Sequence, residues 1–185
     1  NIVTAVDVPI TVGHSGYMGS ADNKKKKAER NIRLLELELK ENGPDAYIYY
    51  QLGKSYYMQG DYKNASGNFE EGLSFDLDPK LEYVQDMVET YGYSLLNEKR
   101  IPEMMFLQNI YSEFAVSADY VFLMGLAYMN NGLFDKAIEE FNKAKSYKLC
   151  KIDGCNSYKA DYNIGVIYEC LGDTAKAVLS YKKCQ

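Results

Sequence analysis

The chain has 185 residues, 46% hydrophobic and 25% charged, a composition that is normal for a soluble globular protein. Its formal net charge of -5 argues against nucleic acid or an anionic membrane as the main partner. No apolar stretch approaches the roughly 20 residues of a membrane span, and the first residues do not read as a secretory signal peptide. The four cysteines are irregularly spaced, so we expect reduced thiols and a cytoplasmic location.

The first residues differ from everything that follows. IVTAVDVPITV, at residues 2–12, alternates apolar and polar side chains with the period of a half-buried strand, and Pro9 suits an edge position. A lone strand has no partner for its backbone groups. We therefore expect residues 1–23 to be an extended remnant or linker at the end of a preceding domain. The lysines at positions 24–27 are interpreted as a solvated linker rather than a phosphate site.

Residues 28–42 predict a leading helix. Ile32, Leu35 and Leu39 recur with a period close to that of an α-helix, and Gly43-Pro44 is a stop signal. We expect this helix to cover the exposed side of the first unit of the region that follows, residues 24–185.

Three later stretches share one pattern of anchors: YYQLGKSYYMQGDYKNASGNFEEGL, VFLMGLAYMNNGLFDKAIEEFNKAK and DYNIGVIYECLGDTAKAVLSYKKC. Each has an apolar residue, a glycine and a tyrosine, then a second glycine, an alanine, an aromatic residue and a small residue at matching spacings. The anchors are Leu52, Gly53, Tyr56, Gly60, Ala65, Phe69 and Gly72; Met124, Gly125, Tyr128, Gly132, Ala137, Phe141 and Ala144; and Ile164, Gly165, Tyr168, Gly172, Ala177, Tyr181 and Cys184.

The spacing predicts a pair of helices in each copy. Leu52, Gly53 and Tyr56 fall on one helical face. Gly60 sits where a first helix ends, and Asp61 is a candidate N-cap for a second helix. A fourth, degenerate copy lies between the first two, with Gly92 as its glycine and Pro102 near the start of its second helix. The predicted units are residues 46–79, 85–117, 118–151 and 158–185.

These anchors resemble the tetratricopeptide repeat, in which a Trp, Leu-Gly and Tyr are followed by small and aromatic slots. Tyr49 stands in the Trp slot, and Pro79 closes the first unit. The resemblance implies an all-α fold: a right-handed superhelix of antiparallel helix pairs, here with a short extended N-terminal segment.

The resemblance also implies a concave groove that binds a protein or peptide. Its tyrosines offer large, rigid contact area with a hydrogen-bonding tip. The alternative interpretation, of equal weight, is that these tyrosines follow from the tyrosine-rich composition of the chain or pack against a missing domain. The Lys/Asn/Arg clamp for chaperone carboxylates is absent. The groove positions are Tyr47, Tyr50, Lys54 and Tyr57; Asp86, Glu89 and Tyr93; Asp119, Phe122, Leu126 and Met129; and Lys159, Tyr162 and Glu169.

Residues 1–79 resemble bacterial family 2 glycosyltransferases that carry C-terminal tetratricopeptide repeats. The matching residues are His14, Gly16, Tyr17, Arg30, Asn31, Leu34 and Leu35. The resemblance implies that His14 helps to bind a divalent metal or diphosphate in an intact parent enzyme. The catalytic domain itself is absent from the sequence. Asp76-Leu77-Asp78 lies at a repeat boundary and is interpreted as turn chemistry rather than as a metal motif.

Cys150 and Cys155 form a C-x₄-C pair in an insert between the last two units. Zinc needs more ligands than this pair offers, so we expect neither a metal nor a disulfide there. No nucleophile, phosphate loop or paired-carboxylate constellation predicts catalysis, and no cofactor is expected in this chain.

Two functions follow. The main interpretation is a non-catalytic interaction region of a cytoplasmic glycosyltransferase that uses a nucleotide-sugar donor. The alternative is a free-standing tetratricopeptide adaptor with no linked enzyme. Self-association is left open in both.

Overall fold

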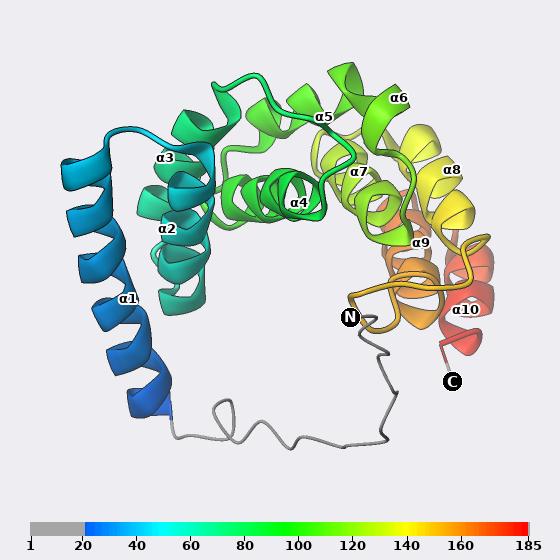
Figure 1. Ribbon diagram of the computed structural model, residues 1–185. Coiled ribbons are helices and arrows are strands. Elements are labelled where there is room, and N and C mark those ends of the chain that lie inside the picture. Colours follow the sequence, from blue (N-terminus) through cyan, green and yellow to red (C-terminus); the bar gives the residue numbers. More distant parts are fainter. Residues whose placement is uncertain (1–20, 185) are drawn as a thin grey trace, which may run out of the picture.

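The computed structural model describes residues 21–184, and this part of the chain contains helices and their connections but no strand. The helices stack side by side into an arc, with α1 at one end and α10 at the other (Figure 1). The elements are α1 (Ala21–Asn42), α2 (Ala46–Gln59), α3 (Tyr62–Leu73), α4 (Glu82–Asn97), the 3₁₀ helix η2 (Ile101–Met105), α5 (Phe106–Asn109), α6 (Tyr111–Phe114), α7 (Ala118–Asn130), α8 (Phe134–Ala144), α9 (Tyr158–Cys170) and α10 (Thr174–Lys182).

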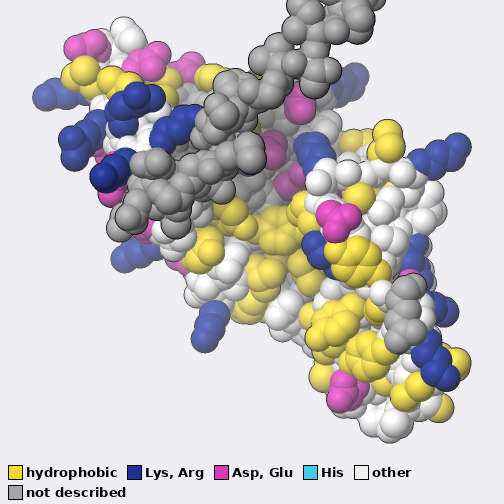
Figure 2. Space-filling model, turned by 90° about the horizontal axis from the view of Figure 1, so that it is seen from below, with side chains coloured by type: hydrophobic (Ala, Val, Ile, Leu, Met, Phe, Trp, Pro, Cys, Tyr) yellow, Lys and Arg dark blue, Asp and Glu magenta, His cyan; other side chains and the backbone are white. Residues whose placement is uncertain are grey.

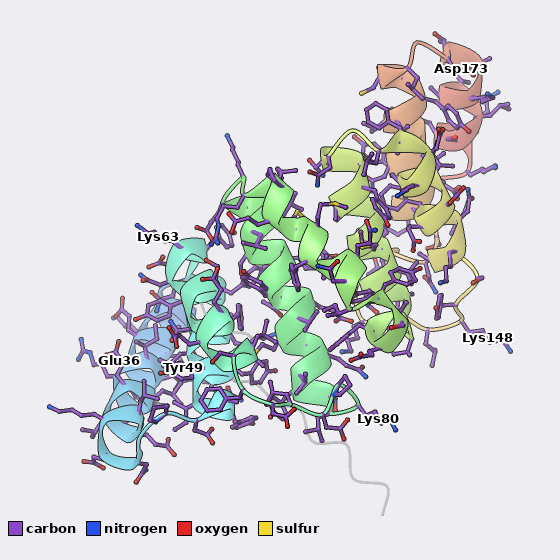
Figure 3. All side chains as sticks on the ribbon, turned by 90° about the horizontal axis from the view of Figure 1, so that it is seen from above. Glu36, Tyr49, Lys63, Lys80, Lys148 and Asp173 are labelled. Atoms are coloured by element: carbon purple, nitrogen blue, oxygen red, sulfur yellow. The ribbon has the colours of Figure 1, made fainter. Side chains whose placement is uncertain are left out.

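Helices α2, α4, α7 and α9 are the first helices of the four predicted units, and the arc curves around them (Figure 1). Seen from above, Lys63 and Asp173, in or beside the turns within units, lie along one edge of the array (Figure 3). Lys80 and Lys148, in the connections between units, lie along the opposite edge. The predicted all-α repeat fold is therefore confirmed for residues 21–184. The predicted strand and His14 lie outside the described residues.

Glycine lets the two helices of a unit approach closely. A Cβ atom added at Gly53 would lie 2.4 Å from the ring of Phe69 in the partner helix. The same contact recurs between Gly125 and Phe141, and between Gly165 and Tyr181. The recurring glycine and aromatic anchors are thus one physical contact, in which a ring of the second helix lies on the backbone of the first.

The turn inside a unit needs a left-handed residue. Gly60 follows α2 with φ 78°, and Asp61 caps α3 by accepting a hydrogen bond from the Asn64 N–H. Gly132 and Gly172 take the same conformation in the third and fourth units. These turns confirm the helix ends that the sequence predicted.

The second unit departs from this pattern. Lys99 stands in the slot that glycine fills elsewhere, and it adopts φ 62°. The single second helix expected after it is broken into η2, α5 and α6. Arg100 holds the start of this region to α3, because its guanidinium donates to Glu70 at 2.8 Å and to Ser66 Oγ at 3.1 Å.

Helix α1 begins at Ala21, earlier than the predicted start at residue 28. It includes the four lysines that the sequence analysis placed in a linker. Lysine is a good helix former, so the run extends the helix instead of ending it. Ile32 of α1 packs against Ile48 and Leu52 of α2, as the covering role predicts.

The largest core cluster runs from α4 to α9 and is centred on α7. From Ala118 to Gly125 every residue of α7 is buried. The connection after α8 folds back over the start of α7, where Asp119 accepts backbone hydrogen bonds from Lys151 and Ile152.

Candidate peptide-binding groove

Three tyrosines gather on the inner face where α2 meets α4. The Tyr47 and Tyr50 ring centroids are 5.7 Å apart. Tyr83, from the first turn of α4, lies edge-on to Tyr47 at 5.3 Å and tilted to Tyr50 at 5.7 Å. Tyr47 stays 51% exposed, so its ring presents an apolar surface with little conformational freedom to lose.

Asp86 joins the two helices beside these rings. Its Oδ2 accepts a hydrogen bond from the Tyr50 hydroxyl at 2.8 Å and pairs with Lys54 Nζ at 2.7 Å. Partial burial, followed by the bond to Asp86, raises the pKa of Tyr50, which stays a neutral donor. The arrangement fixes one negative and one positive group at the side of the tyrosine cluster.

These residues line a hollow of ≈ 470 Å³, which we call the tyrosine groove. It is lined by Tyr47, Tyr50, Gln51, Lys54, Leu81, Glu82, Tyr83, Asp86 and Lys151. Hydrophobic side chains gather over the middle of the molecule when it is seen from below, with basic and acidic side chains beside them (Figure 2). The groove thus combines apolar area with hydrogen-bonding and charged groups of both signs.

Glu89 and Tyr93, further along α4, were predicted to line the groove, but both are more buried than a groove-lining position requires. Glu89 is 7% exposed, accepts from Ser117 Oγ at 3.1 Å and lies 3.7 Å from Lys151 Nζ. Burial raises its pKa, and the charge of Lys151 partly offsets that rise. The Tyr93 hydroxyl is buried without a hydrogen-bond partner among the described residues.

The other predicted groove residues on α2 and α7 pack within the protein. Tyr57 is half-buried, with its ring 5.4 Å from that of Tyr62 on α3. Phe122 is 5% exposed, and its ring is tilted against that of Phe141 with the centroids 5.3 Å apart, so it belongs to the core. Leu126 and Met129 are half-buried against the same core cluster.

None of the predicted residues on α9 lines the tyrosine groove, and two of them contact α10. Tyr162 is 55% exposed, and its ring lies 5.7 Å from that of Tyr181. Glu169 accepts a hydrogen bond from the Tyr181 hydroxyl at 2.7 Å. Lys159, the third predicted residue, has its Nζ 5.9 Å from the centre of the Tyr158 ring. The structure therefore brings together Tyr47, Tyr50, Lys54 and Asp86 but not the whole predicted set.

Five residues that line the groove were missed by the sequence analysis: Gln51, Leu81, Glu82, Tyr83 and Lys151. Tyr83 lies one turn before Asp86 on α4, so the i, i+3 step could have found it. Lys151 comes from the insert after α8, whose path no repeat spacing predicts.

The described residues contain no group of three or more histidine, cysteine or acidic side chains arranged to hold a metal ion. Cys150 and Cys155 are both free thiols. None of the helices in the described part combines the length and apolar character that a bilayer span requires.

Comparison with solved structures identifies several proteins of the same shape. MamA shares 27% identity with this chain at a TM-score of 0.71, covering 91% of this chain and 94% of that one. MamA from Desulfovibrio magneticus RS-1, residues 41 to the end, shares 21% identity at 0.71 and covers 94% and 95%. YrrB, described as a TPR protein with an unusual peptide-binding site, shares 22% at 0.71 and covers 86% and 77%. Curated proteins give no match.

The family profile of the tetratricopeptide repeat matches residues 46–79, 118–149 and 158–185, just over half of the chain. It leaves out the second unit, whose second helix is broken. With this coverage and the stacked helix pairs, the chain belongs to the tetratricopeptide repeat family.

Proposed function

We propose that this chain is an adaptor that binds an extended peptide segment of a partner protein in the tyrosine groove. The observation that carries the proposal is the hollow of ≈ 470 Å³, in which three tyrosine rings lie beside the Lys54–Asp86 pair. Apolar side chains of a peptide would pack on the rings, while its backbone and polar groups would bond to Gln51, Lys54 and Asp86. Rigid aromatic residues with hydrogen-bonding tips commonly carry the binding energy of such surfaces.

The likeness to YrrB supports a peptide as the ligand class, because that protein is described as having a peptide-binding site. The likeness to MamA extends over 91% of this chain and 94% of that one. We therefore favour the adaptor over the glycosyltransferase interpretation. The latter rests on residues 1–79, and neither MamA nor YrrB is described as a glycosyltransferase.

The test uses the full chain and a phage-displayed library of random peptides. Selected peptides are synthesised with a fluorophore, and their affinities are measured by anisotropy. The groove variant Tyr47→Ala with Tyr83→Ala removes two ring faces but leaves the Tyr50–Asp86 bond in place. We expect it to weaken binding by about tenfold or more.

The matched control is Leu34→Ala with Leu37→Ala on α1, where both leucines are more than half exposed. This control should bind with unchanged affinity. Equal affinity in the groove variant, with a circular dichroism spectrum like that of the wild type, would contradict the proposal. Nucleotide-sugar binding, measured by calorimetry with UDP-glucose, tests the glycosyltransferase alternative separately.

A further inference from the structure

The backbone of the connection between α8 and α9 is anchored to α7 by the Asp119 carboxylate. Asp119, 2% exposed in the first turn of α7, accepts the Ile152 N–H at Oδ1 (2.7 Å) and the Lys151 N–H at Oδ2 (2.9 Å). The Asn156 side-chain amide closes the same loop by donating to the Tyr147 carbonyl at 2.9 Å. The docked loop places the Lys151 side chain at the tyrosine groove.

Two thiols lie inside this docked loop, close to each other. Cys155 is fully buried, with its sulfur 3.8 Å from Asp119 Oδ1. Cys150 is half-buried and donates its S–H to Asn156 Oδ1 at 3.2 Å, which places its sulfur beside the residue that follows Cys155. Burial, the Asp119 charge and the neighbouring Cys150 thiol together raise the pKa of Cys155. The remaining cysteines lie elsewhere, Cys170 at the end of α9 and Cys184 after α10.

We propose that Cys150 and Cys155 form a reversible disulfide, with a hydroperoxide as oxidant, that locks this loop onto Asp119. The inference is independent of the peptide-binding proposal, because it concerns covalent chemistry within the loop. It differs from the sequence-based expectation of two inert thiols, since the spacing alone did not show how the folded loop places them.

The chemistry balances in two steps. The more exposed Cys150, as thiolate, attacks the peroxide oxygen; the O–O bond breaks, and Cys150 becomes a sulfenic acid while the peroxide is reduced to water or an alcohol. The Cys155 sulfur then attacks the Cys150 sulfur, the S–O bond breaks, and hydroxide leaves as water with the thiol proton of Cys155.

Asp119 is the general base for the second step. Its Oδ1 lies beside the Cys155 sulfur, where it can take the thiol proton as the S–S bond forms and pass it to the leaving hydroxide. Burial, and then the nearby Asp119 charge, raise the pKa of Cys155, which keeps it a thiol until Cys150 has been oxidised. This order follows from exposure as well, because Cys150 is the thiol that solvent reaches.

The disulfide would close a covalent ring that includes the two residues whose backbone N–H groups bond Asp119. Lys151 and Ile152 lie between the two cysteines in sequence, and their N–H groups are the ones that bond Asp119. A cross-link restricts the conformations available to the segment that it encloses. Oxidation should therefore keep these two N–H groups on Asp119 and hold Lys151 at the groove.

The test uses the full chain with Cys170→Ser and Cys184→Ser, which leaves only the two loop thiols. The protein is treated with hydrogen peroxide, free thiols are blocked with N-ethylmaleimide, and the chain is digested with trypsin. Because Lys151 separates the cysteines, the disulfide would join peptides 149–151 and 152–159. We expect this linked pair as the main product, and its loss with dithiothreitol. Mixing ¹⁵N-labelled and unlabelled chains distinguishes links within a chain from links between chains.

Blocked or over-oxidised thiols without the linked pair, or links only between chains, would overturn the proposal. The locking step has its own readout: hydrogen exchange at the Lys151 and Ile152 amides should be slower in the oxidised chain, and equal or faster exchange would refute it. Asp119→Asn, which loses the proton acceptor, should form the link more slowly, while Cys150→Ser should block it. Circular dichroism checks that each variant is folded.

Discussion

At the level of single residues, the approach of the two helices in a unit is set by glycine against an aromatic ring. Gly53, Gly125 and Gly165 each lie so close to a ring that a methyl group would overlap it. The sequence predicted these positions because the same spacing occurs three times. It did not show that the two anchors touch, which only the packed helices reveal.

Gly53→Ala should destabilise the protein by about 1–3 kcal/mol, because its Cβ would lie 2.4 Å from the buried Phe69 ring and that ring would have to move. The matched control is Gly67→Ala in the adjacent helix α3, where the added Cβ meets nothing within 4 Å. That change should stabilise by roughly 0.5–1 kcal/mol. Urea unfolding measures both, and a destabilised Gly67→Ala or a neutral Gly53→Ala would count against the packing described.

Lys99 gives a second test at this scale. It occupies the turn position that glycine fills in the other units, and it has φ 62°. A left-handed conformation costs a residue with a side chain on the order of 1 kcal/mol. Lys99→Gly should therefore stabilise the chain, by up to about 1 kcal/mol in thermal or urea unfolding. A loss of stability would show that the lysine side chain makes a contact worth more than the strain.

Glu89 predicts a pH dependence. Burial raises its pKa above the ordinary 4.5, so the folded chain holds a proton that the unfolded chain has already released. Its contribution to stability is therefore present below about 4.5 and is lost as the pH rises through the folded pKa.

The measurement is the free energy of unfolding of the wild type and of Glu89→Gln, obtained by urea unfolding at pH values from below about 4.5 upward. The free energy of unfolding of the wild type minus that of the variant should fall with rising pH. The comparison cancels the contribution of Glu140, whose pKa burial also raises. A difference that rises or stays flat would contradict the buried position of Glu89.

At the level of elements, the regular helix pairs follow from local signals and the irregular parts do not. The ends of α2 and α3 were predictable because a glycine in the left-handed region and an aspartate cap mark them. The broken second helix of the second unit was not. Pro102 is compatible with a helix start, and nothing local shows that η2, α5 and α6 would replace one helix.

The loop between α8 and α9 is a further long-range feature, because its anchor lies on another element. Asp119 was expected to line the groove, yet its carboxylate accepts the N–H groups of Lys151 and Ile152. Sequence spacing places Asp119 on α7 correctly but contains no information on which segment folds back to it.

Asp119→Ala should release the loop and cost about 1–3 kcal/mol, since two backbone N–H groups lose their acceptor. Asp119→Asn, which keeps one side-chain oxygen, should cost less. Hydrogen exchange at the Lys151 and Ile152 amides provides the local measurement and should be faster in the alanine variant. Unchanged exchange at these two amides would show that the loop is held by other contacts.

At the level of the whole molecule, the arc places α2 and α4 side by side (Figure 1). The tyrosine groove is lined by side chains from both helices. The repeat pattern placed Tyr47, Tyr50 and Lys54 on the concave face, because α2 is a regular helix whose inward-facing positions follow from the spacing of its anchors. The same pattern placed Phe122 in the groove, but its side chain is only 5% exposed. How far a residue is buried depends on its neighbours in other units, which the spacing within one unit does not show.

Mapping the bound peptide on the full chain tests the central claim most directly. A peptide selected from the random library is titrated into ¹⁵N-labelled protein, and amide shifts are followed by NMR. The account predicts the largest changes at Gln51, Lys54, Tyr83 and Asp86, with little change on α1 or α10. Changes concentrated instead on the outer helices α3, α8 and α10, with the groove amides unmoved, would contradict it.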